Sequence, residues 1–173
     1  MKATLEIINR MQADGVIGQY AIGGAVGATF YLEPVATLDI DVFVSFRDVP
    51  TGGLISLSPI YDYLRAHRYK PEGEYVIIEG WPVQFLPAGD ALLEEALAEA
   101  IGTDLEGVPT RVMTAEHLTA IALKTGRAKD HARILQFVEG GTLDADKLDG
   151  VLKRYGLLEK WERFGDKFLK DNS

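Results

Sequence analysis

The stretch that decides the fold is residues 20–46, which read YAIGGAVGATFYLEPVATLDIDVFVSF. Residues 19–22 are typical of a short buried strand, which Gly23 and Gly24 interrupt before a run of small residues that suits a closely packed helix. Residues 37–46 are rich in β-branched and aromatic types and indicate a second strand. The stretch therefore predicts a strand, a glycine turn, a helix and a second strand in direct succession.

Two carboxylates lie on the second predicted strand. Asp39 and Asp41 are two residues apart, so their side chains project to the same side while Leu38, Ile40 and Val42 face the other. Like charges so close together repel, and a divalent cation or abundant solvent can keep both ionised. Magnesium suits such a pair because it takes a few carboxylates and completes its shell with substrate phosphates.

The glycines complement this pair. Gly23 and Gly24 end a strand and open a helix, so that bare amides and the positive helix end can approach a phosphate closely. Taken alone, a tight turn explains the two glycines, and a solvated strand face explains the Asp-x-Asp pattern. Their combination in this order favours a metal site and a phosphate site side by side.

Composition sets the wider limits. The chain has 173 residues, 47% hydrophobic and 25% charged, which is typical of one globular domain with a small appendage. It has no cysteine, no signal-peptide pattern and no apolar run of about 18 residues, so we expect a cytoplasmic protein without a membrane span. The net charge of −8 argues against a broad nucleic-acid footprint. A local basic cluster is the place where we expect a polyanion to bind: Arg111, Lys124, Arg127, Lys129 and Arg133.

The rest of the chain divides into an α/β part and a helical part. Up to residue 112 we predict a helix at 3–12, a helix from Ser58, strands at 75–78, 83–86 and 108–112, and a helix at 89–101. Pro82 and Pro87 bracket one of these strands and suggest that it lies at a sheet edge. Beyond Thr114 we predict helices at 114–125, 128–138, 144–155 and 157–170. We therefore expect an α/β core over residues 1–112 and a helical subdomain over residues 113–173.

Two motifs resemble those of a known family. Gly23-Gly24 followed by Thr37-Leu-Asp39-Ile-Asp41 resembles the signature of the nucleotidyltransferase superfamily, and its spacing is similar to that of the abortive-infection (AbiEii-type) toxin branch. The stretch from Leu118 to Asp130 is similar to the second signature of that branch. The resemblance implies an α/β nucleotidyltransferase-like mixed sheet flanked by helices and followed by a helical part.

The resemblance also implies a reaction. Magnesium (or manganese) held by Asp39 and Asp41 would orient a nucleoside triphosphate, and an acceptor would attack its α-phosphorus while pyrophosphate leaves. Lys124 would neutralise phosphate charge, and Asp130 would orient that lysine or contact the acceptor. The implied partners are transfer RNA, a protein or a small molecule as acceptor, and a cognate antitoxin. The nucleotide-binding residues implied are Gly23, Gly24, Thr37, Gln84 and Lys124.

Two of these residues also fit an ordinary structural role. Lys124 can be a solvated helix-end charge that complements the helix dipole, and Asp130 can be a charge in the first turn of a helix.

The chain departs from the family pattern at two positions. Members often carry a third acid on a neighbouring strand, where this sequence has Gln84, and an amide cannot act as a general base. Glu74 or Glu79 could substitute for it. Toxin relatives also tend to have an arginine where this chain has Val35.

Two rival hypotheses remain. A dinucleotide-binding unit also has a strand, glycines and a later acid, although the G-x-G-x-x-G spacing is missing here. Alternatively, the chain is a catalytically silent nucleotide-binding or protein-interaction member of the same fold, with Gln84 marking lost chemistry. Four apolar residues near the C-terminus could then form an interface, although packing within the protein is the commoner role: Leu157, Trp161, Phe164 and Phe168.

Overall fold

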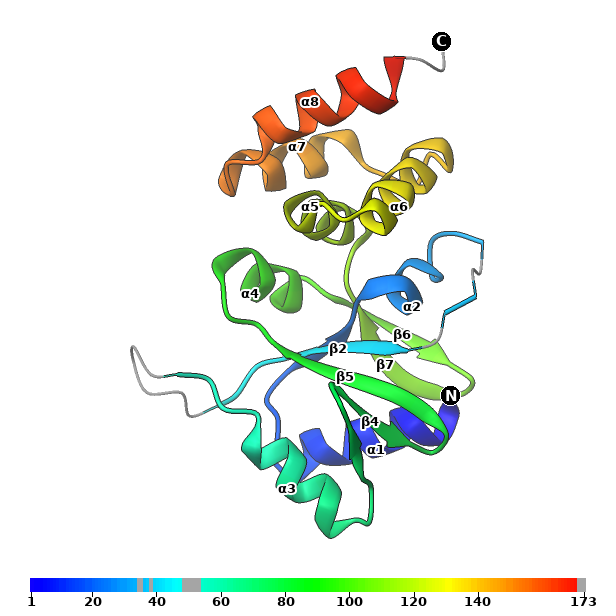
Figure 1. Ribbon diagram of the computed structural model, residues 1–173, viewed down its shortest axis with the longest axis vertical. Coiled ribbons are helices and arrows are strands. Elements are labelled where there is room, and N and C mark those ends of the chain that lie inside the picture. Colours follow the sequence, from blue (N-terminus) through cyan, green and yellow to red (C-terminus); the bar gives the residue numbers. More distant parts are fainter. Residues whose placement is uncertain (34–35, 38, 48–53, 171–173) are drawn as a thin grey trace.

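The computed structural model describes residues 1–33, 36–37, 39–47 and 54–170. Val35 and Leu38, which the sequence patterns singled out, lie outside the described residues. The molecule is elongated, with an α/β part at one end and helices at the other (Figure 1). None of the described helices is both long and apolar enough to cross a membrane.

One mixed sheet forms the α/β part. Its strands are β1 (Tyr20–Ile22), β2 (Ile40–Val44), β3 (Pro71–Glu72), β4 (Tyr75–Ile78), β5 (Trp81–Pro87), β6 (Ile101–Leu105) and β7 (Val108–Val112). Their order in the sheet is β3-β4-β5-β2-β1-β7-β6. The pairs β2/β5 and β1/β7 are parallel, and the other neighbours are antiparallel. The mixed sheet flanked by helices is the predicted fold class.

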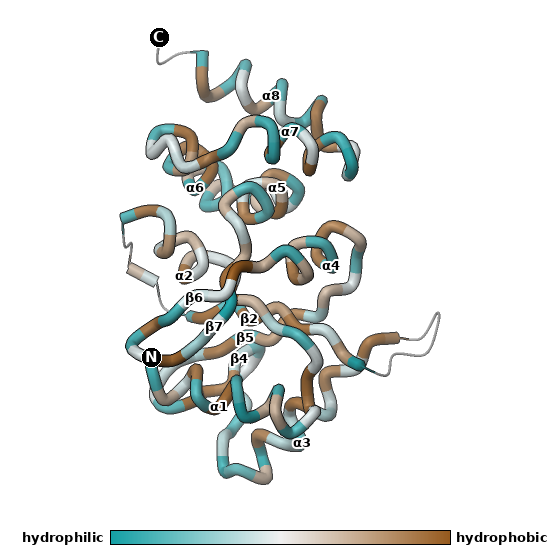
Figure 2. The backbone as a smooth tube through the Cα atoms, turned by 180° about the vertical axis from the view of Figure 1, so that it is seen from behind, coloured by the Kyte–Doolittle hydropathy of each residue, from teal (hydrophilic) through white to brown (hydrophobic). Residues whose placement is uncertain are grey.

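The helices cover both faces of the sheet. In the α/β part they are α1 (Lys2–Ala13), α2 (Gly24–Ala28), α3 (Ser58–Ala66) and α4 (Ala91–Ala98), and beyond it α5 (Ala115–Thr125), α6 (Ala128–Glu139), α7 (Ala145–Arg154) and α8 (Leu158–Phe168). Helices α1 and α3 lie on one side of the sheet, whereas α2 and α4 lie on the side that faces α5–α8 (Figures 1 and 2).

Side-chain alternation along β2 fixes which face carries the acids. Ile40, Val42 and Val44 are fully buried in the same hydrophobic cluster as α1. Phe43 instead packs in a second cluster with Met113. Because successive strand residues point to opposite faces, the odd-numbered positions of β2 face α2 and the C-terminal helices. The prediction that the carboxylates lie opposite Ile40 and Val42 is confirmed for Asp41.

Two sequence predictions about the sheet are wrong. The helix expected over 89–101 ends at Ala98, and Ile101 begins β6, which forms a hairpin with β7. Strand β5 is not at an edge, since β4 and β2 flank it. Pro82 and Pro87 are tolerated there because one is the second residue of the strand and the other is the last, where a missing N–H disrupts least.

The C-terminal helices follow the predicted boundaries closely. Thr114 caps α5 by accepting a hydrogen bond from the backbone N–H of His117 at 3.2 Å, and Gly126 ends it in the left-handed conformation, φ +71°. Helices α5–α8 share one hydrophobic cluster, which includes Phe164 and Trp161. We propose to treat residues 1–112 and 113–173 as two structural units, because the helical cluster is largely separate from the one beneath the sheet.

Candidate functional site

The glycine turn lies directly against the strand that carries the acids. The backbone N–H of Gly23 donates to the carbonyl of Asp41 at 3.0 Å. Gly24 has φ +57°, and a Cβ atom added to it would lie 2.0 Å from Asp41 Oδ2. A side chain at Gly23 would likewise meet the ring of Phe43 at 2.5 Å. Both glycines are therefore needed for the turn to approach β2 this closely.

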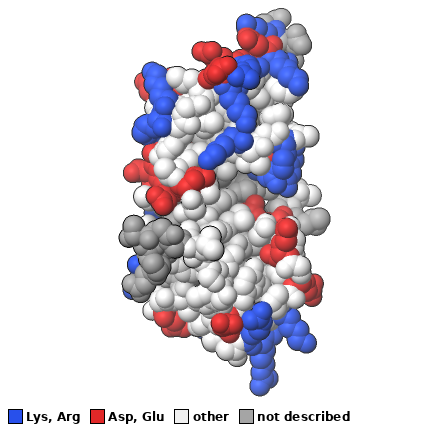
Figure 3. All heavy atoms as spheres, turned by 60° about the vertical axis from the view of Figure 1, so that its left-hand side comes forward, with Lys and Arg blue, Asp and Glu red and all other residues white. Residues whose placement is uncertain are grey.

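A cleft of about 510 Å³ opens at this point between the sheet and the C-terminal helices. Asp39, Asp41 and Gly24 line one side of it, and α5 and α6 line the other. In Figure 3, basic side chains of the helical part lie above acidic side chains of the α/β part, with a hollow between them. The polar lining residues are Asp39, Asp41, Glu74, Tyr75, Gln84, Thr125, Arg127, Lys129, Asp130 and Arg133.

The two aspartates repel each other in this cleft. Burial and the neighbouring charge of Asp39 together raise the pKa of Asp41, although the cations Lys129, Arg133 and Arg127 partly oppose the shift. The charge of Asp39, with burial and a hydrogen bond to that carboxylate, also raises the pKa of the Tyr75 phenol. The cleft thus concentrates negative charge on the sheet side, which a bound cation would relieve.

The donor set fits magnesium delivered with a nucleotide. Among the described residues, no group of three or more His, Cys, Asp and Glu side chains is arranged to hold a metal ion. Asp41 lies in β2 and Asp39 lies directly before it, and both supply carboxylate oxygens to the cleft. Magnesium needs only one or two carboxylates when substrate phosphates complete its shell. The pair therefore fits a shared metal-nucleotide site and not an all-protein cage.

Asp130 holds an arginine at the opposite wall of the cleft. It is 1% exposed and accepts hydrogen bonds from the backbone N–H of Arg127 at 3.1 Å and from its Nε at 2.8 Å. Burial alone would raise the pKa of Asp130, but the hydrogen bonds from Arg127 and the nearby charge of Arg133 hold it below the usual value. The acid in the first turn of α6 thus fixes Arg127 and not, as the resemblance implied, Lys124.

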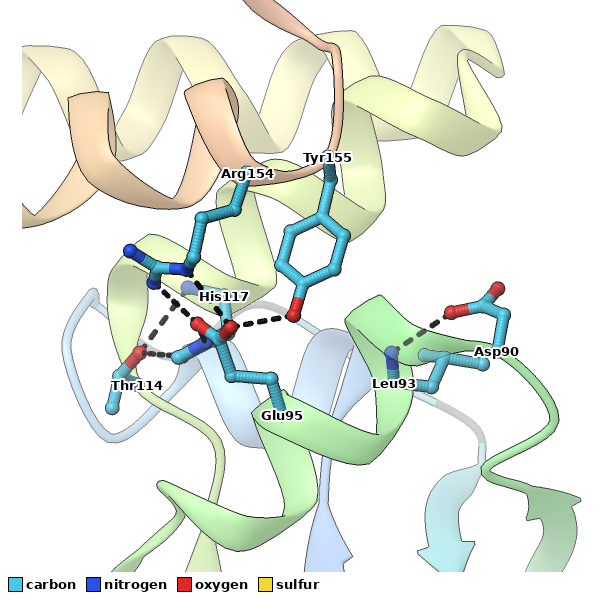
Figure 4. A network of polar contacts seen from close by, with 7 residues as sticks. All are labelled: Asp90, Leu93, Glu95, Thr114, His117, Arg154 and Tyr155. Atoms are coloured by element: carbon cyan, nitrogen blue, oxygen red, sulfur yellow. Dashed lines mark hydrogen bonds and ion pairs between the residues drawn. The ribbon is translucent and has the colours of Figure 1, made fainter.

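Lys124 lies outside the cleft lining. Its Nζ donates to Asp90 Oδ2 at 2.8 Å, and Asp90 is the residue that caps α4 by accepting from the N–H of Leu93 (Figure 4). The lysine side chain is half exposed at the end of α5. The structure therefore places Lys124 as a helix-end charge paired with a cap, and does not bring it to the carboxylates.

Thr37 also lies outside the cleft lining. Its hydroxyl donates to the backbone carbonyl of Asp39 at 3.1 Å, so it shapes the approach to β2.

Three other cations line the cleft in which the resemblance implied that Lys124 would neutralise phosphate charge. Arg127, Lys129 and Arg133 all line the cleft. From the sequence, these three residues were expected in a basic cluster but were not assigned to the metal-nucleotide site. A signal was present, because Lys129 and Arg133 are four residues apart and share one face at the start of α6. Arg111 leaves the cluster altogether, since its guanidinium donates to carbonyls at the end of α4.

Gln84 lies where the family pattern places a third acid. In the parallel β2/β5 register its Cα is the partner of Asp41, and its side chain lines the same cleft. Its Nε2 donates to Glu74 Oε2 at 3.4 Å. Glu79 instead accepts a hydrogen bond from the Tyr69 hydroxyl, which raises the pKa of that phenol to about 12.

A second polar cluster joins the α/β part to the helical part away from the carboxylates. Glu95 of α4 accepts from the guanidinium of Arg154 and the hydroxyl of Tyr155, and it contacts His117 Nε2 at 3.0 Å (Figure 4). His117 is 5% exposed, with Thr114 at its other ring nitrogen. These contacts, those from Arg154 above all, lower the pKa of Glu95 to about 2.

This cluster borders a cavity of about 680 Å³, which is larger than the cleft at the aspartates. Its central charges already neutralise one another, as those of Glu95 and Arg154 do. We therefore assign it to packing between the two parts and take the smaller cleft as the candidate site.

The strand register excludes one rival. A dinucleotide-binding unit needs parallel strands on either side of its glycine-rich turn and helix. Here β1 and β2, which α2 connects, pair antiparallel, with Tyr20 opposite Val44.

Sheet order and helix placement define a nucleotidyltransferase-like α/β fold. The chain is similar in structure to an antigenic nucleotidyltransferase-like protein from Paracoccidioides brasiliensis, with a TM-score of 0.57 and 12% identity over 93% of this chain and 91% of that one. It is also similar to the antibiotic-resistance factor ANT(2'')-Ia, with a TM-score of 0.51 and 16% identity over 94% and 97%. No family model and no curated protein sequence matches the chain. At such identities the likeness shows the fold, and it does not identify the toxin branch.

Proposed function

We propose that this protein is a magnesium-dependent nucleotidyltransferase that transfers a nucleoside monophosphate from a nucleoside triphosphate to an acceptor. One observation carries the proposal: Asp39 and Asp41 face Arg127, Lys129 and Arg133 across a single cleft. Carboxylates suit a hard divalent cation, and cations suit phosphates, so the cleft has complementary partners for both halves of a metal-nucleotide complex.

Each wall of the cleft has its own task. Asp39 and Asp41 hold the metal, magnesium or manganese, at the sheet side. When bound, the metal supplies Lewis-acid polarisation of the phosphate and neutralises charge on the departing pyrophosphate. Arg127 and Lys129 bind the phosphate oxygens from α6, and Asp130 keeps Arg127 oriented for this. The absence of a side chain at Gly24 lets the backbone of the turn approach Asp41 closely, so that a phosphate held by the metal would lie near this backbone.

The cleft volume limits what the site encloses. About 510 Å³ is within the range of small-molecule sites and accommodates little more than a nucleotide. The acceptor therefore presents only its reacting group, as a small molecule, an RNA end or a protein side chain would. A small-molecule acceptor gains support from the antibiotic-resistance factor among the structural neighbours. An RNA or protein acceptor, a cytoplasmic toxin role and a cognate antitoxin gain support from the sequence motifs alone.

A second candidate function is nucleotide binding without transfer. Gln84 favours it, because the amide beside Asp41 cannot take a proton from an acceptor. The two candidates share the metal-nucleotide site and differ only in turnover.

The test separates binding from transfer. Each labelled nucleoside triphosphate is incubated with the protein, magnesium and one acceptor pool at a time: total transfer RNA, a protein lysate or a panel of hydroxyl-bearing antibiotics. A labelled product that disappears in Asp41→Asn supports transfer and identifies the acceptor. Magnesium-dependent nucleotide binding without product, even for Gln84→Asp, supports the silent alternative. Absence of nucleotide binding contradicts both.

A further inference from the structure

We propose that Glu74 is the general base of the transfer reaction and that Gln84 is the residue that positions it. This inference rests on the proposed function and adds the proton acceptor that the strand position beside Asp41 lacks. The observation behind it is a row of side chains across neighbouring strands, which runs from the metal-binding face of β2 through β5 to the start of β4.

The sheet register brings the row together. Gln84 is the partner of Asp41 in the parallel β2/β5 pair. On its other side, β5 pairs antiparallel with β4, with Val83 opposite Val76, so the next step of the register brings Gln84 beside Tyr75. Neighbouring strands are about 4.8 Å apart, so Asp41, Gln84 and Tyr75 occupy adjacent positions of one surface.

A tight hairpin places Glu74 at the end of this row. Gly73 has φ +64° and makes the turn between β3 and β4, and Glu74 follows it directly. Glu74 is exposed and lines the same cleft as Asp39 and Asp41.

Gln84 acts as a donor towards this carboxylate. Its Nε2 donates to Glu74 Oε2 at 3.4 Å, a long hydrogen bond that links the hairpin acid to the β5 position beside Asp41. An aspartate or glutamate at position 84 would repel Glu74 at this distance, whereas an amide attracts it. Gln84, which departs from the family pattern, is thus the residue type that is compatible with Glu74 as the acid in the cleft.

The other acids nearby are committed elsewhere. Asp39 and Asp41 are needed for the metal, and Asp130 is buried under Arg127. Glu79 accepts from the Tyr69 hydroxyl and does not line the cleft. In the described part of the chain, Glu74 is therefore the carboxylate in the cleft that is free to accept a proton.

The proposed step conserves atoms and electrons. The Glu74 carboxylate removes the proton from the acceptor hydroxyl, and the acceptor oxygen forms a bond to the α-phosphorus. The bond between the α-phosphorus and its bridging oxygen to the β-phosphate breaks, and that oxygen keeps the electron pair as pyrophosphate departs. General-base help of this kind contributes roughly 10²- to 10⁴-fold to a rate.

The experiment measures binding and turnover separately. Binding of magnesium and a non-hydrolysable α,β-methylene ATP analogue is followed by calorimetry, and pyrophosphate release is followed with each natural triphosphate, with the acceptor pools above and with water alone. Glu74→Gln should lower turnover by roughly 10²-fold or more while the analogue's Kd changes less than about 3-fold. Glu72→Gln, on the exposed β3 strand next to the same hairpin, is the matched control and should retain turnover.

A double variant distinguishes a base from a structural residue. Glu74→Gln combined with Gln84→Asp moves the carboxylate from the hairpin to β5, and should recover at least about 10-fold of the lost turnover. Gln84→Ala should lower kcat without raising KM for the triphosphate, since it only releases Glu74.

The opposite results overturn the assignment. Unchanged turnover in Glu74→Gln would do so, and so would a wild-type protein that binds the analogue but never releases pyrophosphate. A wild-type protein that does not bind the analogue overturns the proposed function together with it.

Discussion

Gly24 and Asp41 fit together with no space for a side chain between them: a Cβ atom on Gly24 would lie 2.0 Å from Asp41 Oδ2. Contacts under 3.0 Å are essentially never made by real Cβ atoms, so one of the two residues would have to move. Because Asp41 is part of the proposed metal site, the position of a backbone turn and the position of a ligand are set by the same contact.

The first prediction concerns this contact. Gly24→Ala should displace the Asp41 carboxylate and weaken magnesium-dependent nucleotide binding at least about 10-fold, measured by calorimetry. Gly15→Ala is the matched control, since Gly15 also has positive φ, +76°, but no atom lies within 4 Å of its added Cβ. Both variants suffer backbone strain of roughly 1 kcal/mol, and only Gly24→Ala should lose the ligand. Equal loss in both would show that strain alone is responsible.

The second prediction separates binding from stability at Asp41. Asp41→Asn should abolish magnesium-dependent nucleotide binding, yet it should leave the metal-free protein as stable as the wild type or raise its Tm by roughly 2–4 °C. The reason is that burial and Asp39 both disfavour the charged carboxylate, and the amide removes that repulsion. Thermal melts with and without magnesium and nucleotide check both effects. A lower Tm in the metal-free state would contradict this repulsion.

The third prediction compares two lysines at helix ends. Lys129→Gln should weaken triphosphate affinity by roughly 5- to 10-fold, because Lys129 lines the cleft opposite the aspartates. Lys124→Gln should change that affinity less than about 2-fold, because the Lys124 ammonium is paired with Asp90. Loss of this exposed pair costs at most about 1 kcal/mol of stability. Titrations of both variants at two salt concentrations decide the matter, and the reverse ranking would restore the role that the resemblance gave to Lys124.

The fourth prediction concerns pH and the Glu95 cluster. Hydrogen bonds from Arg154 and others lower the Glu95 pKa from 4.5 in the unfolded chain to about 2 in the folded one. The unfolded state therefore binds a proton first as the pH falls, so this stabilisation is complete above about pH 4.5 and is lost on the way down to pH 2. Allowing for partial exposure, we expect roughly 1–2 kcal/mol. Urea denaturation between pH 2 and 7 should show a smaller decline for Glu95→Gln than for the wild type.

The parts of the fold with strong local patterns could be predicted from the sequence. The β-branched run around Asp41 formed β2, and the capping residue Thr114 began α5 as expected. Strand β6 was missed because its residues are largely exposed and lack apolar alternation, and only pairing with β7 makes them a strand. The prediction that β5 lies at a sheet edge was wrong for a related reason. Prolines near the two ends of the strand indicated an edge, but β5 pairs with β4 and β2 on its two sides.

For the candidate site too, the features that depend on local spacing could be predicted, and the contacts between distant residues could not. Local spacing was enough to predict that Asp41 faces away from the core and that the glycines adjoin it. It could not show that Lys124 turns towards Asp90, because that contact spans 34 residues of sequence. Local spacing also could not choose between Glu74 and Glu79, which lie at opposite ends of β4. The folded chain places Glu74 beside Gln84 and Glu79 beside Tyr69.

The place of Gln84 beside Asp41 also constrains how the gene can change. Glutamine and glutamate codons differ by a single nucleotide, so an acid at this position is one point mutation away from the present sequence. Such a mutation would add a fourth carboxylate to the sheet side of the cleft, which already holds Asp39, Asp41 and Glu74, and would remove the amide that attracts Glu74. On the proposed assignment, an acid at position 84 would repel the hairpin acid that Gln84 now attracts, so the effect of a change at position 84 depends on the residue at position 74.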